Sequence, residues 1–66
     1  IKIKLNGKIK LIPENSKILT LLNDLKIPIK KVAIELNQEI LDKKKLNKIK
    51  IQKNDKIEIV HFIGGG

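Results

Sequence analysis

The sequence predicts an α+β fold in which one helix packs on one face of a mixed sheet of four to five strands. Apolar and polar residues alternate near both ends of the chain, as in strands with one buried face. A leucine-rich segment between them has helical spacing. The elements follow in the order strand, strand, helix, strand, short strand, strand. A helix that crosses between a hairpin and later strands favours a single-sheet roll.

The N-terminal residues predict a β-hairpin. Residues 1–5 alternate apolar side chains with lysine, and residues 8–12 resume the alternation. Asn6-Gly7 between them suits a two-residue turn, whose central positions need positive φ. We expect the odd-numbered apolar residues of both strands to share the buried face: Ile1, Ile3, Leu5, Ile9 and Leu11.

Residues 17–26 predict a short helix. Pro13 ends the preceding strand because it has no N–H to donate, and Pro28 limits the helix at its other end. Asn15 or Ser16 is placed to cap the helix N-terminus. The helix should turn a stripe of apolar residues, centred on Leu22, toward the sheet: Ile18, Leu19, Leu21, Leu22 and Leu25.

The second half of the chain predicts the remaining strands. Val32–Leu36 alternates with its apolar residues inward, and Asn37-Gln38 turns it into a short returning strand over 39–41. Leu46 is expected to pin a lysine-rich stretch to the core. The last strand, Ile57–Ile63, becomes central if it lies beside the first, with Ile57 and Ile59 facing the helix.

Composition narrows the functional classes. A chain of 66 residues forms one small domain, whose core is too small to house a deep catalytic pocket. The absence of cysteine excludes a disulfide framework, a thiolate metal site and a thiol nucleophile. No apolar stretch approaches the ~20 residues of a membrane span, and no signal-peptide pattern opens the chain. We therefore expect a cytoplasmic protein with no membrane partner.

The formal net charge of +8 would ordinarily suggest a nucleic-acid partner. All 15 basic residues are lysine, however, whereas arginine is the residue that makes bidentate hydrogen bonds to phosphates and guanine edges. The lysines are scattered along the chain, and Phe62 is the sole aromatic residue, which leaves no platform for base stacking. The pattern favours a solvated surface over a nucleic-acid site.

The chain closes on Val60-His61-Phe62-Ile63-Gly64-Gly65-Gly66. Three glycines cannot help the fold, because glycine loses the most backbone entropy on ordering and buries no side chain. They offer instead a slim backbone that can enter a narrow channel and present a carboxylate to another protein's active site. We therefore divide the chain into a domain over 1–63 and a flexible tail over 64–66, and interpret the tail as functional.

The last strand also predicts a docking patch. Val60 and Phe62 fall on the face opposite Ile57 and Ile59, which the helix does not cover, and Ile63 follows them. Exposed apolar residues close to a reactive end indicate a surface for partner binding. His61 lies where the strand leaves the core and is expected at the solvent edge rather than in a catalytic role.

Four segments resemble the ThiS family of sulfur carrier proteins in thiamine biosynthesis: KIKLNGK, VAIELNQEI, NDKIEI and the final VHFIGGG. The resemblance covers essentially the whole chain, and the family's relatives are ubiquitin-like β-grasp proteins. The family requires two terminal glycines, whereas this chain has three. Gly65-Gly66 match the pair, and Gly64 is an extension.

The resemblance implies a protein co-substrate rather than an enzyme. A ThiF-type adenylyltransferase would spend ATP to convert the Gly66 carboxylate into an acyl-adenylate, with Gly64 and Gly65 threading its active site. A cysteine-derived persulfide would then displace AMP and leave a thiocarboxylate. A ThiG-type thiazole synthase would take this sulfur into the thiazole ring of thiamine. The chain itself would bind no cofactor and no metal.

Three other functions stay open from the sequence. The small subunit of molybdopterin synthase shares the roll and the Gly-Gly end, although it is usually longer and often has a proline-rich approach to the glycines. A protein-conjugating ubiquitin-like modifier is the second. The third, from a different class, is a basic RNA-binding β-grasp module, which would not need a free Gly-Gly terminus.

Overall fold

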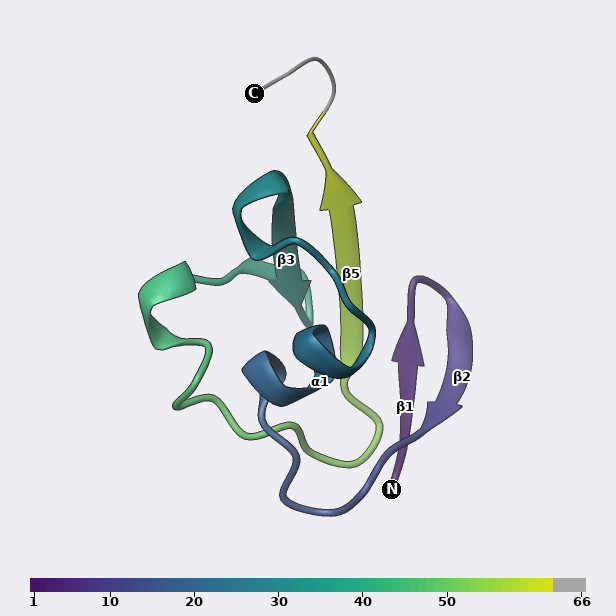
Figure 1. Ribbon diagram of the computed structural model, residues 1–66. Coiled ribbons are helices and arrows are strands. Elements are labelled where there is room, and N and C mark those ends of the chain that lie inside the picture. The colour runs from purple at the N-terminus through teal and green to yellow at the C-terminus, as the bar shows by residue number, and fades with distance from the viewer. Residues whose placement is uncertain (63–66) are drawn as a thin grey trace.

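A five-stranded mixed sheet with one α-helix forms the protein, and the computed structural model describes residues 1–62 (Figure 1). The elements in chain order are β1 (Lys2–Leu5), β2 (Lys8–Leu11), α1 (Ile18–Asp24), η1 (Ile29–Lys31), β3 (Val32–Leu36), β4 (Glu39–Ile40), η2 (Lys43–Lys45) and β5 (Lys56–His61). The sheet order is β2-β1-β5-β3-β4, with β1 and β5 parallel and the other neighbours antiparallel. The predicted α+β roll is confirmed, and its last strand is central.

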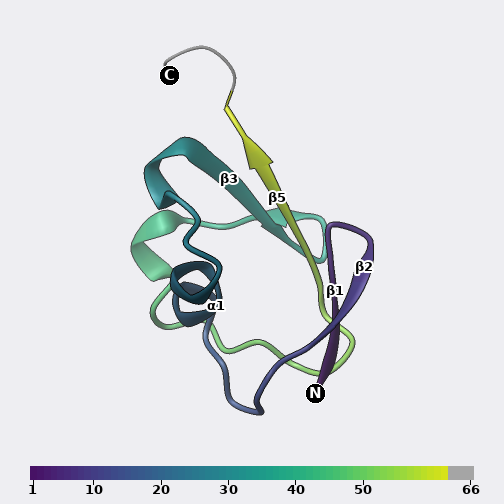
Figure 2. The ribbon, with the colours of Figure 1, turned by 45° about the vertical axis from the view of Figure 1, so that its right-hand side comes forward.

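The hydrophobic core lies between α1 and one face of the sheet (Figure 2). Leu22, at the middle of the helix stripe, is 0% exposed, as the sequence predicted. Leu46 is 1% exposed and fixes the long connection before β5 to the core. The buried apolar residues are Ile3, Ile12, Ile18, Leu21, Leu22, Val32, Ile34, Leu46, Ile51, Ile57 and Ile59. Within residues 1–62, no helix has the length and apolarity that a membrane crossing demands.

The start of α1 differs from the expectation. Lys17 occupies the N-cap position without a capping side-chain hydrogen bond, so the prediction of Asn15 or Ser16 was wrong. The Ser16 hydroxyl donates to the Pro13 carbonyl at 2.6 Å instead. The first helical N–H groups are satisfied by main-chain carbonyls from later in the chain: Ile18 N–H donates to Ile49 and Leu19 N–H to Leu46. Because these acceptors come from a distant segment, local sequence does not reveal this cap.

The end of α1 is a Schellman motif built on lysine instead of glycine. Lys26 N–H donates to the Asn23 carbonyl at 3.0 Å, and Ile27 N–H donates to the Leu22 carbonyl at 3.0 Å. This places Lys26 in the left-handed region at φ 58°, where residues with a Cβ are strained. The Leu22 carbonyl, freed at the last turn of the helix, is thereby satisfied.

The hairpin forms as predicted, but its second strand faces the other way. Ile9 and Leu11 are 64% and 75% exposed, so their expected burial was wrong. The two-residue turn pairs Leu5 with Lys8 and Ile3 with Lys10. Directly paired residues share a face, and an odd residue of β1 therefore shares its face with an even residue of β2. The exposed pair stands on the open face, away from α1.

Candidate functional site

The site that the sequence predicts lies at the end of β5, and pairing on both sides positions this strand. Its first residues pair with β1 in the register Lys4↔Lys56 and Leu5↔Ile57. Its pairing with β3 runs further, to Val32↔His61, and Phe62 N–H adds a hydrogen bond of 2.9 Å to the Lys31 carbonyl. The end of β5 is therefore held by β3 alone, because its pairing with β1 is confined to its first residues (Figure 1).

Two asparagine side chains attach turns to β5. Asn6, in the hairpin turn at φ 50°, accepts a hydrogen bond from Ile59 N–H at 2.7 Å through Oδ1. Asn37, in the β3–β4 turn, accepts from Lys56 N–H at 2.9 Å and donates from Nδ2 to Asp55 at 3.0 Å. Sequence reasoning assigned both asparagines to turns and missed these long-range bonds. The sequence feature that could have indicated these bonds is asparagine at a left-handed turn position, because its side chain can form hydrogen bonds with nearby main-chain groups.

The side chains of β5 alternate as predicted. Ile57 and Ile59 are buried at 0% and 8%, whereas Val60 is 53% exposed and Phe62 is 51% exposed. His61 is exposed as well, in line with its expected place at the solvent edge. Val60 and Phe62 thus reach solvent at the end of the strand that leads toward the glycines. Their role in docking a partner stays a prediction.

Lys43 of η2 contacts the predicted patch. Its Nζ lies 5.1 Å from the centroid of the Phe62 ring, within the range of a cation–π interaction. Phe62 remains half-exposed with this lysine over it, so the ring is not buried by the connection after β4. Lys43 is the first of three consecutive lysines in η2, and this basic segment therefore begins beside the end of β5.

The remaining residues of the predicted site, Ile63, Gly64, Gly65 and Gly66, lie outside the described residues, as does the boundary between the domain and the tail. Across residues 1–62, no three His, Asp or Glu side chains form a group that could hold a metal ion. The described end of this segment offers two half-exposed apolar side chains, Val60 and Phe62, for contact with another molecule.

These features define a small ubiquitin-like β-grasp protein, in which one helix covers a mixed sheet and the C-terminal strand is central. The chain belongs to the ThiS family, whose sequence model matches residues 3–66. The expected family is confirmed.

Relatives of two lengths resemble the chain. The sulfur carrier protein ThiS of Bacillus subtilis is 38% identical over 65 residues, covering 97% of this chain and 98% of that protein. The thiazole synthase of Paramagnetospirillum magneticum is 37% identical over 65 residues, covering 98% of this chain and 20% of that protein. The chain thus spans about a fifth of the thiazole synthase. The crystal structure of thiamine biosynthesis protein ThiS from Geobacter metallireducens matches with a TM-score of 0.88 at 29% identity, with both chains fully covered.

Proposed function

We propose that the chain carries sulfur for thiazole formation in thiamine biosynthesis, as a thiocarboxylate on Gly66. The observation that carries this proposal is the placement of β5. This central strand leads to half-exposed Val60 and Phe62, and the sequence continues through Ile63 into the three glycines. A rigid strand that leads into residues without side chains suits a carboxylate that must reach into another protein's active site.

The proposed chemistry has three steps. An oxygen of the Gly66 carboxylate attacks the α-phosphorus of ATP on a ThiF-type adenylyltransferase, and pyrophosphate leaves. The terminal sulfur of a cysteine persulfide then attacks the acyl carbon and displaces AMP. The product is an acyl disulfide that keeps the sulfur–sulfur bond of the persulfide. A second thiol attacks the donor cysteine's sulfur and breaks this bond, so that the terminal sulfur stays on the acyl carbon as a thiocarboxylate and the thiol and the donor cysteine form a disulfide. ATP is consumed by the partner, and the chain itself holds no cofactor.

The acceptor of the sulfur is proposed to be a ThiG-type thiazole synthase. Proteins named thiazole synthase contain a segment similar to nearly the whole of this chain, which supports a functional link between the two activities. We expect the reaction in the cytoplasm, where thiols are kept reduced and a persulfide donor can be regenerated.

Val60, Phe62 and Ile63 are proposed to dock the chain on these enzymes. The two described residues of this patch present apolar surface close to the reacting end, and burial of such surface on a partner is favourable. Gly64 and Gly65 would then lie in the partner's channel, where a Cβ would obstruct the approach. The patch supplies binding energy, whereas the glycines supply access.

The adenylation step can be tested by isotope exchange. The chain is incubated with a ThiF-type adenylyltransferase, ATP and labelled pyrophosphate, because reversible formation of the acyl-adenylate moves label into ATP. The native chain should support exchange. A chain that lacks Gly65-Gly66 and a chain extended beyond Gly66 should not support exchange. Both variants should nevertheless have the same melting temperature as the native chain. Exchange supported equally well by the extended chain would contradict the proposal.

A further inference from the structure

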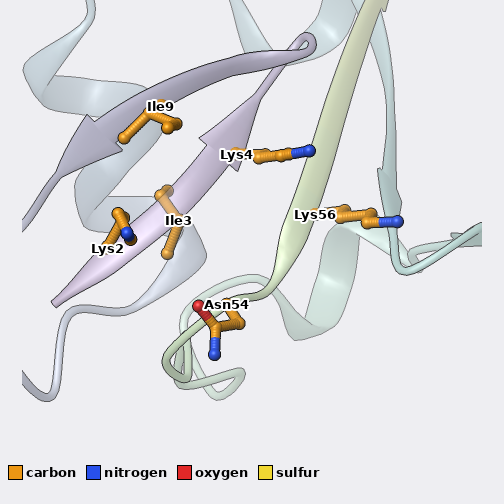
Figure 3. A pocket seen from close by; sticks show the side chains of 6 residues that line it. All are labelled: Lys2, Ile3, Lys4, Ile9, Asn54 and Lys56. Carbon is orange, nitrogen blue, oxygen red and sulfur yellow. The ribbon is translucent and has the colours of Figure 1, made fainter.

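A hollow of about 280 Å³ lies at the other end of β5, where β1, β2 and the turn before β5 meet (Figure 3). Its floor is apolar and its rim is basic. The residues that line it are Lys2, Ile3, Lys4, Ile9, Asn54 and Lys56. All three lysines are exposed, and Ile9 is 64% exposed although it is apolar. Figure 3 shows the side chains of Lys4 and Lys56 extending in the same direction from neighbouring strands.

Main-chain hydrogen bonds fix the positions from which these lysines extend. Lys4 N–H donates to the Asp55 carbonyl at 2.9 Å, and Asn54 N–H donates to the Lys2 carbonyl at 2.8 Å. Lys4 also stands directly beside Lys56 in the parallel register of β1 and β5. Like charges at directly paired positions destabilise a sheet. A local arrangement that lowers stability, such as this repulsion between two lysines, is expected where a surface serves binding.

The nearest acidic side chain in the sequence does not relieve this conflict. Both carboxylate oxygens of Asp55 accept other hydrogen bonds, Oδ1 from Asn37 Nδ2 at 3.0 Å and Oδ2 from Gln52 N–H at 2.7 Å. The carboxylate thereby holds together the two turns at this end of β5. Lys2, Lys4 and Lys56 are exposed, so an external anion can reach their ammonium groups.

We propose that this hollow binds an extended acidic segment of a partner protein, with an apolar side chain of the segment on Ile9 and its carboxylates beside Lys2, Lys4 and Lys56. Charge complementarity selects the occupant. A chain of net charge +8 repels a second copy of itself, so self-association at this face is disfavoured. The exposed side chain of Ile9 would gain from burial against an apolar side chain.

The composition of the rim distinguishes a protein segment from a phosphate ligand. Lysine ammonium groups are point charges on flexible stems, without the arginine forks or converging main-chain N–H groups that build a phosphate site. The sole aromatic residue, Phe62, lies beyond the opposite end of β5, so no base can stack at the hollow. The six residue-to-residue steps of extended chain from Lys56 to Phe62 place the two surfaces roughly 20 Å apart. A partner could therefore hold the hollow while the C-terminal residues stay free, and the inference does not depend on which atom carries sulfur.

The test uses the isotope-labelled chain and a synthetic peptide with one leucine between two pairs of glutamates, followed by amide NMR shifts during titration at low salt. Saturable shifts should concentrate at Lys2, Lys4, Ile9 and Lys56. The double variant Lys4→Gln, Lys56→Gln should bind about fivefold more weakly or worse. The matched variant Lys44→Gln, Lys48→Gln loses the same charge elsewhere and should change affinity less than about twofold. A peptide with serine in place of leucine should bind more weakly to the native chain.

Several results would overturn the proposal. One is the absence of saturable shifts at the hollow. Another is an equal loss of affinity in both double variants, which would show attraction by net charge alone. Equal binding of the serine peptide would remove the role of Ile9. Competition at the same residues by inorganic tripolyphosphate or a short single-stranded RNA, at lower concentration than the peptide, would identify a phosphate site instead.

Discussion

The Asn6 side chain should stabilise the central strand from the hairpin turn. Its Oδ1 accepts from Ile59 N–H at 2.7 Å in a partly buried position, at the point where regular pairing between β1 and β5 has ended. Replacement by glycine preserves the positive φ of the turn but leaves this N–H without its acceptor. An unsatisfied buried donor costs about 1–3 kcal/mol, so Asn6→Gly should lower the free energy of unfolding by about 1–2 kcal/mol.

Two further variants separate the hydrogen bond from the backbone conformation. Asn6→Asp keeps an acceptor oxygen at the same position and tolerates φ 50°, so its stability should stay close to native. Asn6→Ala loses the acceptor and also strains the left-handed position, which adds about 1 kcal/mol to the loss in the glycine variant. The expected order of stability is native and aspartate, then glycine, then alanine.

Urea titration followed by circular dichroism measures these differences. The midpoint should shift while the slope stays constant, because the surface exposed on unfolding hardly changes. In a domain of this size each kcal/mol corresponds to about 4–8 °C in melting temperature, so thermal melts give an independent check. A glycine variant within about 0.3 kcal/mol of native, or an aspartate variant as weak as glycine, would refute a structural role for this bond.

Three more predictions concern the core, the helix end and the docking patch. Leu22→Ala should cost about 2–5 kcal/mol because Leu22 is fully buried, and a loss below ~1 kcal/mol in urea titration would contradict its central place. Lys26→Gly should raise the melting temperature, by relieving a left-handed strain of about 1 kcal/mol; unchanged or lower stability would show that Lys26 makes compensating contacts. Phe62→Ala should weaken binding to the adenylyltransferase in a calorimetric titration yet leave the melting temperature within a few degrees of native, because Phe62 is half-exposed. Native affinity in that variant would remove Phe62 from the docking patch.

The sequence was sufficient for the elements and their order, because alternation and helical spacing are strong wherever one face is buried. The central place of β5 and the exposure of Val60 and Phe62 followed from the same reasoning. The burial of Ile9 and Leu11 was predicted wrongly, since alternation was counted through the turn and the parity that a two-residue turn imposes was not applied. Had the pairing of Leu5 with Lys8 been used, the face of β2 could have been predicted.

Contacts between distant segments were out of reach. The N-terminus of α1 is satisfied by the carbonyls of Leu46 and Ile49, and no local capping signal encodes such a contact. The bond from Ile59 N–H to Asn6 joins residues 53 positions apart and depends on the parallel register of β1 and β5. The basic hollow likewise exists only once three separate segments have come together around Ile9.

Intact mass spectrometry with fragmentation can show whether the Gly66 carboxylate is the group that carries sulfur. The chain is incubated with ATP, a ThiF-type adenylyltransferase and a persulfide donor. One oxygen should be replaced by one sulfur, and every fragment that carries the sulfur should contain Gly66. The chain extended beyond Gly66 should show no replacement. Sulfur found on fragments without Gly66, or acquired by the extended chain, would show that another group carries it.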